Sequence, residues 1–195
     1  MKNIIKIAIF SAIALLTTLN TNAKVQKFVL DPTHTNIVWS ANHAGFSNPS
    51  GKFSKSSGVM FLDESNPESS SVEIEIDTTS IITGFEAFDK HLKTADFLNS
   101  EKFKTAKFVS TKVEVLSKDT AKIHGNLTLL GVTNPVILEA KLNKIGKHPF
   151  TKKKTAGFSA TTTIKRSEFG MKYGIPMVSD EVKLSVEVEG SVEYF

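Results

Sequence analysis

Apolar and polar side chains alternate at every second position along most of this chain, most clearly near its C-terminus. From 182 to 194, valines, a leucine and a tyrosine share one face, while glutamates, a lysine and serines take the other. Successive side chains of a pleated strand point to opposite sides of the sheet, so such a segment buries one face and exposes the other. The pattern therefore favours an antiparallel sheet with one face in water.

The same period, broken by Gly and Asn-Pro, predicts about eight to nine strands. They are expected at 26–31, 35–44, 57–63, 72–76, 105–116, 121–130, 136–142, 156–166 and 182–194. The spacing of Phe85, Phe88 and Leu92 instead predicts one short amphipathic helix. A chain of this kind closes as a barrel or stacks as a sandwich, and its long strands favour an antiparallel barrel of about eight strands.

The first 23 residues have the pattern of an export signal. Lys2 and Lys6 precede an apolar run from 7 to 16, and Thr21-Asn22-Ala23 places small residues where a signal peptidase cuts. The run is short for a membrane span of ~20 residues. We therefore expect a signal peptide at 1–23, cleaved after about Ala23, and a single domain at 24–195. The chain has no cysteine, so no disulfide supports that domain.

The net charge is +4, and loss of Lys2 and Lys6 with the signal leaves 22 basic residues against 20 acidic ones. A nearly neutral domain gives no reason to expect nucleic acid as a partner. Between Glu139 and Glu168 there is no acid, only seven lysines and Arg166. Two interpretations stay open for this segment: a patch that meets anionic lipid headgroups, or a solvated hairpin whose lysines keep sheet edges apart.

Motifs for catalysis and metal binding fail on inspection. The histidines His34, His43, His91, His124 and His148 show no closely spaced pair of the kind that binds a metal on a helix or ribbon. No nucleophile elbow is complete, and thiol chemistry needs a cysteine that the chain lacks. We therefore expect no enzyme activity, no metal and no covalent cofactor.

Several segments, in this order and spacing, resemble the YceI-like family over nearly the whole mature chain. They are Asp31-Pro32-Thr33-His34-Thr35, Gly51-Lys52-Phe53, Thr83-Gly84, Asp89-Lys90-His91-Leu92, Asp96-Phe97-Leu98, Gly125-Asn126-Leu127-Thr128, Gly131-Val132-Thr133-Asn134-Pro135 and Ile164-Lys165-Arg166-Ser167-Glu168-Phe169-Gly170. Leu130 departs from the pattern, because the family often carries a basic residue there.

The resemblance implies a periplasmic, lipocalin-like antiparallel barrel. Such a barrel encloses an isoprenoid lipid, either a polyisoprenoid or an isoprenoid quinone, as its bound ligand and acts as a carrier or reservoir. The resemblance also implies a homodimer as a common assembly and a membrane b-type cytochrome as a partner. The alternative is a packed structural barrel that supports such a cytochrome, or an envelope stress response, without a ligand.

The residues themselves suit an apolar guest, because the chain has 14 Phe against two Tyr and one Trp, and Phe has no polar atom to satisfy. The expected lipid-binding residues are Trp39, Ala41, His43, Phe85, Phe88, Leu92, Phe97, Phe108, Leu127, Phe158, Ala160, Ile164 and Phe169. The expected contacts of a polar headgroup are His34, Asp89, His91 and Arg166.

Each of these polar residues also has a structural interpretation. Asp31 to His34 is explained as well by a turn in which the aspartate accepts hydrogen bonds from backbone amides. Asp89 and Arg166 are explained as well by an ion pair or by anchoring of the helix. The helix itself is either a lid over a ligand or part of the core that plugs one end of the barrel.

Overall fold

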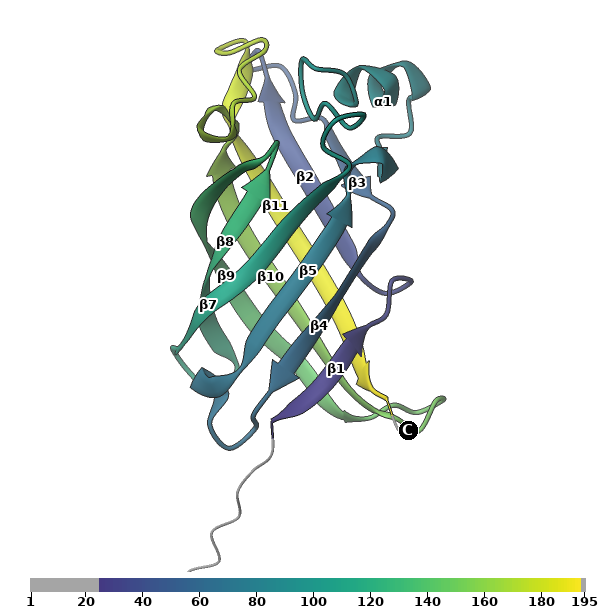
Figure 1. Ribbon diagram of the computed structural model, residues 1–195, viewed down its shortest axis with the longest axis vertical. Helices are drawn as coiled ribbons and strands as arrows, with labels where there is room; N and C mark the ends of the chain where they lie inside the picture. The colour runs from purple at the N-terminus through teal and green to yellow at the C-terminus, as the bar shows by residue number, and fades with distance from the viewer. Residues whose placement is uncertain (1–24, 194–195) are drawn as a thin grey trace, which may run out of the picture.

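A single antiparallel sheet closes on itself to form a tall barrel, with one short helix at the end that we call upper (Figure 1). The computed structural model describes residues 25–193. Strand β1 (Gln26–Leu30) closes the sheet by pairing with β11 (Val178–Val192), where Phe28 lies opposite Val192. Over the described residues the barrel has eight strands, which confirms the predicted all-β fold with a single short helix.

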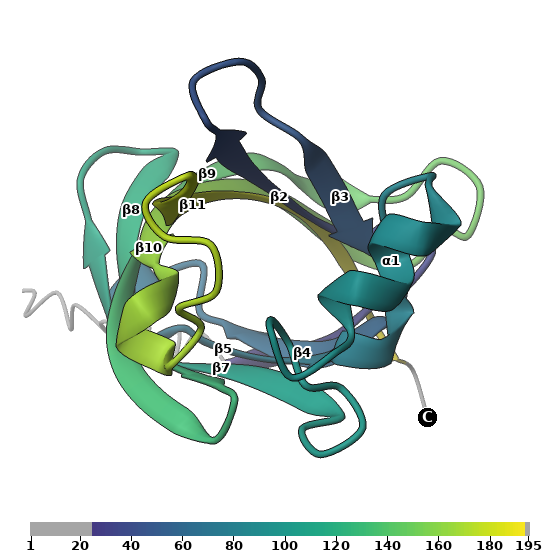
Figure 2. The same ribbon diagram turned by 90° about the horizontal axis from the view of Figure 1, so that it is seen from above.

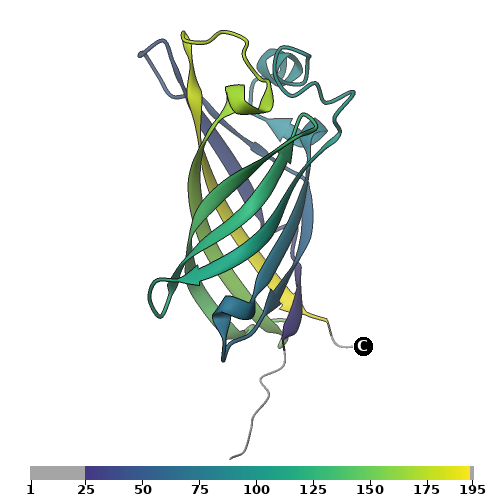
Figure 3. The same ribbon diagram turned by 60° about the vertical axis from the view of Figure 1, so that its left-hand side comes forward.

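The other elements alternate regularly along the chain. They are β2 (Asn36–His43), β3 (Ser50–Phe53), β4 (Ser56–Leu62), β5 (Ser71–Asp77), β6 (Ile81–Ile82), α1 (Glu86–Leu92), β7 (Thr105–Val115), β8 (Thr120–Leu129), β9 (Val132–Lys147) and β10 (Lys154–Lys165), with 3-10 turns η1 (Pro67–Ser69), η2 (Thr78–Ser80) and η3 (Arg166–Phe169). The strands are tilted against the barrel axis, as closure of a sheet requires (Figure 3).

Three of the barrel's eight strands are interrupted, which is why eleven strand segments make up the sheet. Segments β1 and β2 both run antiparallel to β11, and the Asp31 N–H keeps the ladder going by donating to Glu189 O at 2.8 Å. In the same way β4 pairs with β1 while β3 pairs with β2, and η2 separates β5 from β6. These breaks re-aim the wall at its upper end.

The observed strands are longer than some of the expected ones. The prediction placed a strand at 136–142, whereas β9 spans Val132–Lys147, and β11 begins at Val178 instead of 182. The short β3 and β6 were not predicted, because Gly51, Lys52 and Phe53 show too little alternation over four residues. Among residues 25–193, no helix combines the length and the apolar character that crossing a membrane demands.

The interior holds two hydrophobic clusters stacked along the axis. The lower core contains Phe28, Leu30, Ile37, Met60, Ile74, Ala156 and Val186. Phe28 and Ala156 are 0% exposed, so this half is closely packed. The upper core lies beneath α1 and includes Trp39, Leu92, Phe97 and Ile164. The barrel therefore differs between its two ends.

The lysines between Glu139 and Glu168 are spread along the barrel rather than gathered in one patch. Lys144, Lys147 and the exposed Lys152 and Lys153 belong to the β9–β10 hairpin at the lower end (Figure 1). Arg166 lies at the other end and is only 2% exposed. A basic surface formed by this segment is thus confined to the lower hairpin.

Candidate functional site

An apolar cavity of about 290 Å³ occupies the upper half of the barrel, between α1, the upper ends of the strands and the loop that follows η3. Ten of the residues expected to bind a lipid or its headgroup line this cavity. They are Trp39, Ala41, His43, Phe88, His91, Leu92, Phe97, Leu127, Ile164 and Arg166. A wider depression on the outer wall is lined by solvent-facing side chains such as Lys122, Glu139 and Lys183, so the enclosed cavity is the better candidate.

Phe85 and Phe108, two of the expected lipid-binding residues, lie elsewhere. Phe85 precedes α1 and its side chain is 68% exposed, outside the cavity lining. Phe108 is buried against Gly125 of the neighbouring strand, where an added Cβ would come within 2.3 Å of the Phe108 ring. Absence of a side chain at Gly125 therefore makes room for Phe108 in the wall.

Phe158, Ala160 and Phe169 also lie outside the cavity lining. The first two point inward but pack against the lower core. Phe169, 1% exposed, fills the upper core beneath η3. The structure thus divides the predicted set into a group around the cavity and a group that packs the wall.

Arg166 brings a buried positive charge to the cavity. Its Nε and Nη2 donate to the carbonyl oxygens of Ser179 and Val178, both at 2.9 Å, and Nη1 donates to Met171 O at 3.2 Å. Burial lowers the pKa of Arg166 from its ordinary value, and the charge of Asp180 opposes that shift. A guanidinium has five N–H groups, so these three bonds leave donors unused.

Asp180 has a different task from pairing with that guanidinium. Its carboxylate accepts hydrogen bonds from the N–H and the hydroxyl of Ser167, at 2.8 and 2.7 Å. These bonds lower the pKa of Asp180. They also hold η3 against β11, which positions Arg166 beside the cavity.

Aromatic rings surround the cavity opening on the side of α1. The rings of His91 and Phe97 meet edge to face at 5.0 Å between centroids, and Tyr173 lies 5.4 Å from each of them. His91 Nε2 lies 2.9 Å from the carboxylate of Asp96, which fixes the imidazole. Tyr173 is 50% exposed, so this cluster joins the cavity to the surface.

Asp89, a predicted headgroup contact, anchors the helix instead of lining the cavity. Its Oδ1 accepts hydrogen bonds from the N–H and the hydroxyl of Thr83, at 2.7 and 2.6 Å. Phe88, the preceding residue, packs its ring edge to face with Trp39 at 6.1 Å. Asp89 thereby holds α1 over the cavity.

Trp39 carries an unpaired polar atom in this apolar surrounding. Its side chain is 9% exposed, and its indole Nε1 finds no hydrogen-bond partner among the described residues. Buried polar groups in proteins are almost always hydrogen-bonded, so an exception in a cavity wall points to a function of that atom.

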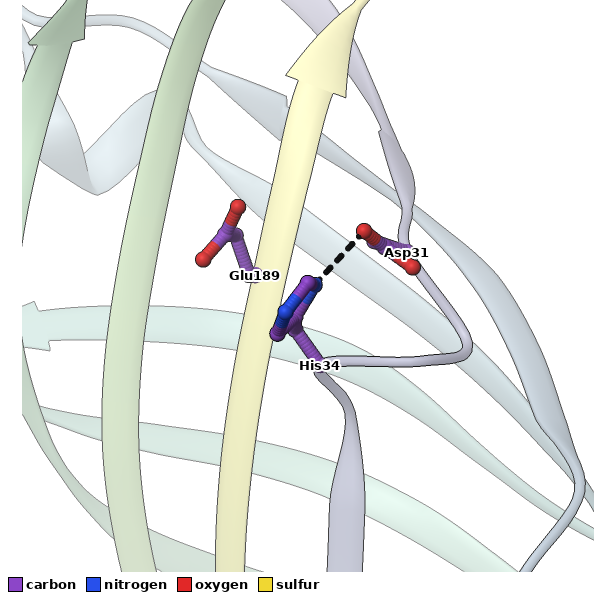
Figure 4. Close-up of side chains that lie close together, drawn as sticks. All are labelled: Asp31, His34 and Glu189. Carbon is purple, nitrogen blue, oxygen red and sulfur yellow. Dashed lines mark hydrogen bonds and ion pairs between the residues drawn. The ribbon is translucent and has the colours of Figure 1, made fainter. Parts of the chain in front are cut away.

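His34, also expected near a headgroup, lies far below the cavity on the outer face. Figure 4 shows its ring beside Asp31, with Nδ1 2.8 Å from Asp31 Oδ2, and with Glu189 on the neighbouring β11. The ligand atoms of these three residues lie within 4.8 Å of one another. Asp31 also accepts hydrogen bonds from the Thr33 N–H and hydroxyl, so it holds the turn between β1 and β2.

Many cavity residues escaped the sequence analysis. Val182 and Leu184 line the cavity and belong to the alternating face from which that analysis started, so a signal was present. Met171 and Tyr173 come from the loop after η3, where no period exists to reveal them.

The closed antiparallel wall and its internal apolar cavity define a small β-barrel with an enclosed binding site. Residues 28–190 match the YceI-like domain, and the chain belongs to this family.

Known proteins extend this finding over the whole barrel. The chain is 37% identical to a UPF0312 protein of Pseudomonas putida (strain W619) over 185 residues, which cover 93% of this chain and 95% of the relative. A crystal structure of the YCEI protein of Campylobacter jejuni matches with a TM-score of 0.70 and 29% identity, covering 78% of this chain and 90% of that one.

A third solved structure shares the fold at lower identity. It is described as a polyisoprenoid binding domain from Saccharophagus degradans implicated in plant cell wall breakdown. The TM-score is 0.66 at 13% identity, and the match covers 87% of this chain and all 100% of that one. At this identity the likeness shows the barrel fold alone.

Proposed function

We propose that this protein encloses an isoprenoid lipid in its upper cavity and acts as a periplasmic carrier or reservoir, without chemistry of its own. The observation that carries the proposal is the cavity itself, with its almost wholly apolar lining. Burial of an isoprenoid chain there gains ~0.8 kcal/mol per methylene equivalent. The polyisoprenoid binding domain of the same fold supports this class of ligand.

The size of the cavity limits the ligand to a slender chain. About 290 Å³ lies at the lower end of the ~300–1,000 Å³ that ligand pockets usually offer. Below it, the packed lower core with Phe28 and Met60 closes the bore. A longer tail enters only where these side chains move aside, and the flexible thioether of Met60 is the easiest to displace.

The polar end of the ligand belongs at the mouth. Arg166 offers unused donors to a quinone carbonyl or a prenyl phosphate, and its charge strengthens a bond to either. His91 and Tyr173 stand beside it. Deeper in the wall, the unpaired Nε1 of Trp39 supplies one further donor. Asp89 and His34 lie outside this group, so they take no part in the proposed contact.

The alternative is a barrel that supports a membrane b-type cytochrome or an envelope stress response without a ligand. The solid lower core is the observation that favours it, because half of the interior has no room for a guest. A homodimer and the cytochrome remain proposed partners under either reading.

One experiment separates the two functions. The protein is purified from its native host under non-denaturing conditions, extracted with organic solvent and analysed by mass spectrometry. An isoprenoid lipid at a stoichiometric level supports the carrier. Repeated preparations without such a lipid overturn it and favour the packed structural barrel.

The proposed location has its own test. The signal sequence predicted at 1–23 lies outside the described residues, which begin at 25. Periplasmic extracts should contain a mature chain whose N-terminal residue, read by Edman sequencing, is Lys24. A chain that retains Met1 and stays in the cytoplasmic fraction contradicts the proposal.

A further inference from the structure

Large apolar side chains stand exposed around the mouth of the cavity. Phe46 is 92% exposed, Phe85 68%, Met177 65% and Tyr173 50%. Phe46 belongs to the β2–β3 hairpin, Phe85 precedes α1, and the other two lie in the loop between η3 and β11. Figure 2, which looks down on the upper end, shows these three segments arranged around the opening. We call these four side chains the mouth rim.

Charge is nearly absent from the two loops that carry most of the mouth rim. Residues 44–49 contain no charged side chain, and residues 170–177 contain only Lys172. Acids would be repelled by the phosphates of a membrane, whereas a lysine beside apolar side chains suits that surface. The loops thus have the composition of a segment that enters the headgroup region of a bilayer.

These loops are held in place by hydrogen bonds to each other. The Ala44 N–H donates to Met177 O at 2.6 Å, which links the hairpin to the loop before β11. Within the hairpin, the Phe46 N–H donates to His43 O at 3.0 Å, and the Gly45 N–H donates to Asn42 Oδ1 at 2.8 Å. A preorganised rim loses little conformational freedom when it meets a surface, so its apolar area contributes more fully to binding.

Tyr173 and His43 connect the rim to the cavity. Tyr173 is both exposed at the rim and part of the cavity lining, and His43 is the lining residue that starts the Phe46 hairpin. An apolar chain that leaves the cavity therefore passes directly between the rim side chains. Contact of the rim with a bilayer lets such a chain cross without exposure to water.

We propose that the mouth rim docks the barrel, upper end down, on a phospholipid bilayer, where ligand enters and leaves the cavity. The inference rests on the proposed lipid-carrier function and adds the surface through which exchange takes place. The lysine-bearing β9–β10 hairpin lies at the opposite end of the barrel. Docking through those lysines instead would turn the mouth away from the membrane.

The chain supplies a matched control for this surface. Phe150 is 87% exposed in the β9–β10 hairpin, far from the rim. Purified mature protein is floated with vesicles of phosphatidylcholine and phosphatidylglycerol in equal amounts, as wild type, Phe46→Ser, Met177→Ser and Phe150→Ser. We expect wild type and Phe150→Ser to bind alike, and each rim variant to bind about tenfold more weakly because it exposes less apolar surface.

Equal vesicle binding by all four proteins, or stronger loss in Phe150→Ser, overturns the proposal. So does a rim variant that changes only the oligomeric state in size-exclusion chromatography, since the rim would then join two copies of the chain. Loading with an isoprenoid from detergent is measured in parallel. Vesicle binding without loading contradicts the carrier function but leaves docking intact, whereas loading without vesicle binding does the reverse.

Discussion

The guanidinium carbon of Arg166 lies 6.0 Å from the centroid of the Phe97 ring, so a buried cation faces an aromatic ring beside the cavity. Such contacts are attractive because the ring face carries partial negative charge. Together with three backbone carbonyls, the ring compensates a charge that has little access to water. The pair joins η3 to the segment after α1 and so closes the upper end of the barrel.

Replacement of Arg166 by Met should destabilise the protein by about 2–4 kcal/mol, because it leaves buried carbonyl oxygens without donors. Urea unfolding monitored by circular dichroism measures the change. Lys165→Met is the matched control, since its side chain is exposed and the change should be within about 0.5 kcal/mol. Equal stability of Arg166→Met and wild type would show that the carbonyls find other partners.

Replacement of Ala41 by Trp should fill the cavity and reduce bound isoprenoid to about a tenth or less, because a packed interior leaves no alternative space for the chain. Ala41 is 8% exposed and lines the cavity. Loading is measured by lipid extraction, and circular dichroism checks the fold. Ala87→Trp, on the exposed face of α1, serves as the control and should load normally. Normal loading of a folded Ala41→Trp protein contradicts the placement of the ligand.

Replacement of Phe28 by Ala should destabilise the barrel by about 3–5 kcal/mol, because the lower core would be left with a void. Phe28 is 0% exposed, whereas Phe46 is 92% exposed and its replacement by Ala should change stability by less than about 0.5 kcal/mol. Thermal and urea unfolding of the two variants make the comparison. A small loss for Phe28→Ala would mean that the lower core collapses around the gap.

The ion pair of His34 with Asp31 should give stability a defined dependence on pH. The hydrogen bond and charge of Asp31 raise the pKa of His34 above its ordinary 6.5. Hydrogen bonds from Thr33 and His34 lower the pKa of Asp31 to about 2. The histidine's contribution is therefore complete below pH 6.5 and is lost as the pH rises through its raised folded-state pKa. The aspartate's contribution is present above pH 3.8 and is lost as the pH falls toward 2.

NMR titration of the imidazole protons measures the pKa of His34 directly. In Asp31→Asn, the pKa of His34 should return toward 6.5, and the stability difference from wild type should shrink at high pH. His124, whose Nε2 lies 3.1 Å from Glu114, is untouched by this change and serves as an internal control. An unchanged pKa of His34 in the variant would refute this account of the turn.

Alternation along the strands was enough to predict the barrel and the inward-facing residues, because a strand's pleat fixes which side chains point inward. It could not predict height along the axis. Ala41, Phe158 and Ala160 all point inward, yet only Ala41 reaches the cavity, since strand tilt and register place the other two beside the lower core. Register comes from long-range pairing, which one sequence does not display.

The polar part of the site was predicted less well, for a local reason. Arg166 was expected at the end of a strand, but it begins η3, and this turn bends its side chain inward. Tyr173 follows in a loop without period, so nothing in the sequence marked it as a cavity residue. His34 and Asp89 turned out to hold a turn and a helix, the structural alternatives considered for them.

The stacking of a solid lower core beneath a hollow upper one separates two demands that usually conflict. Folding draws on the base, where side chains interlock, so a vacant chamber above it need not endanger the native state. Such a vessel tolerates both filling and emptying, and selection is free to reshape the chamber for other guests while the foundation stays the same.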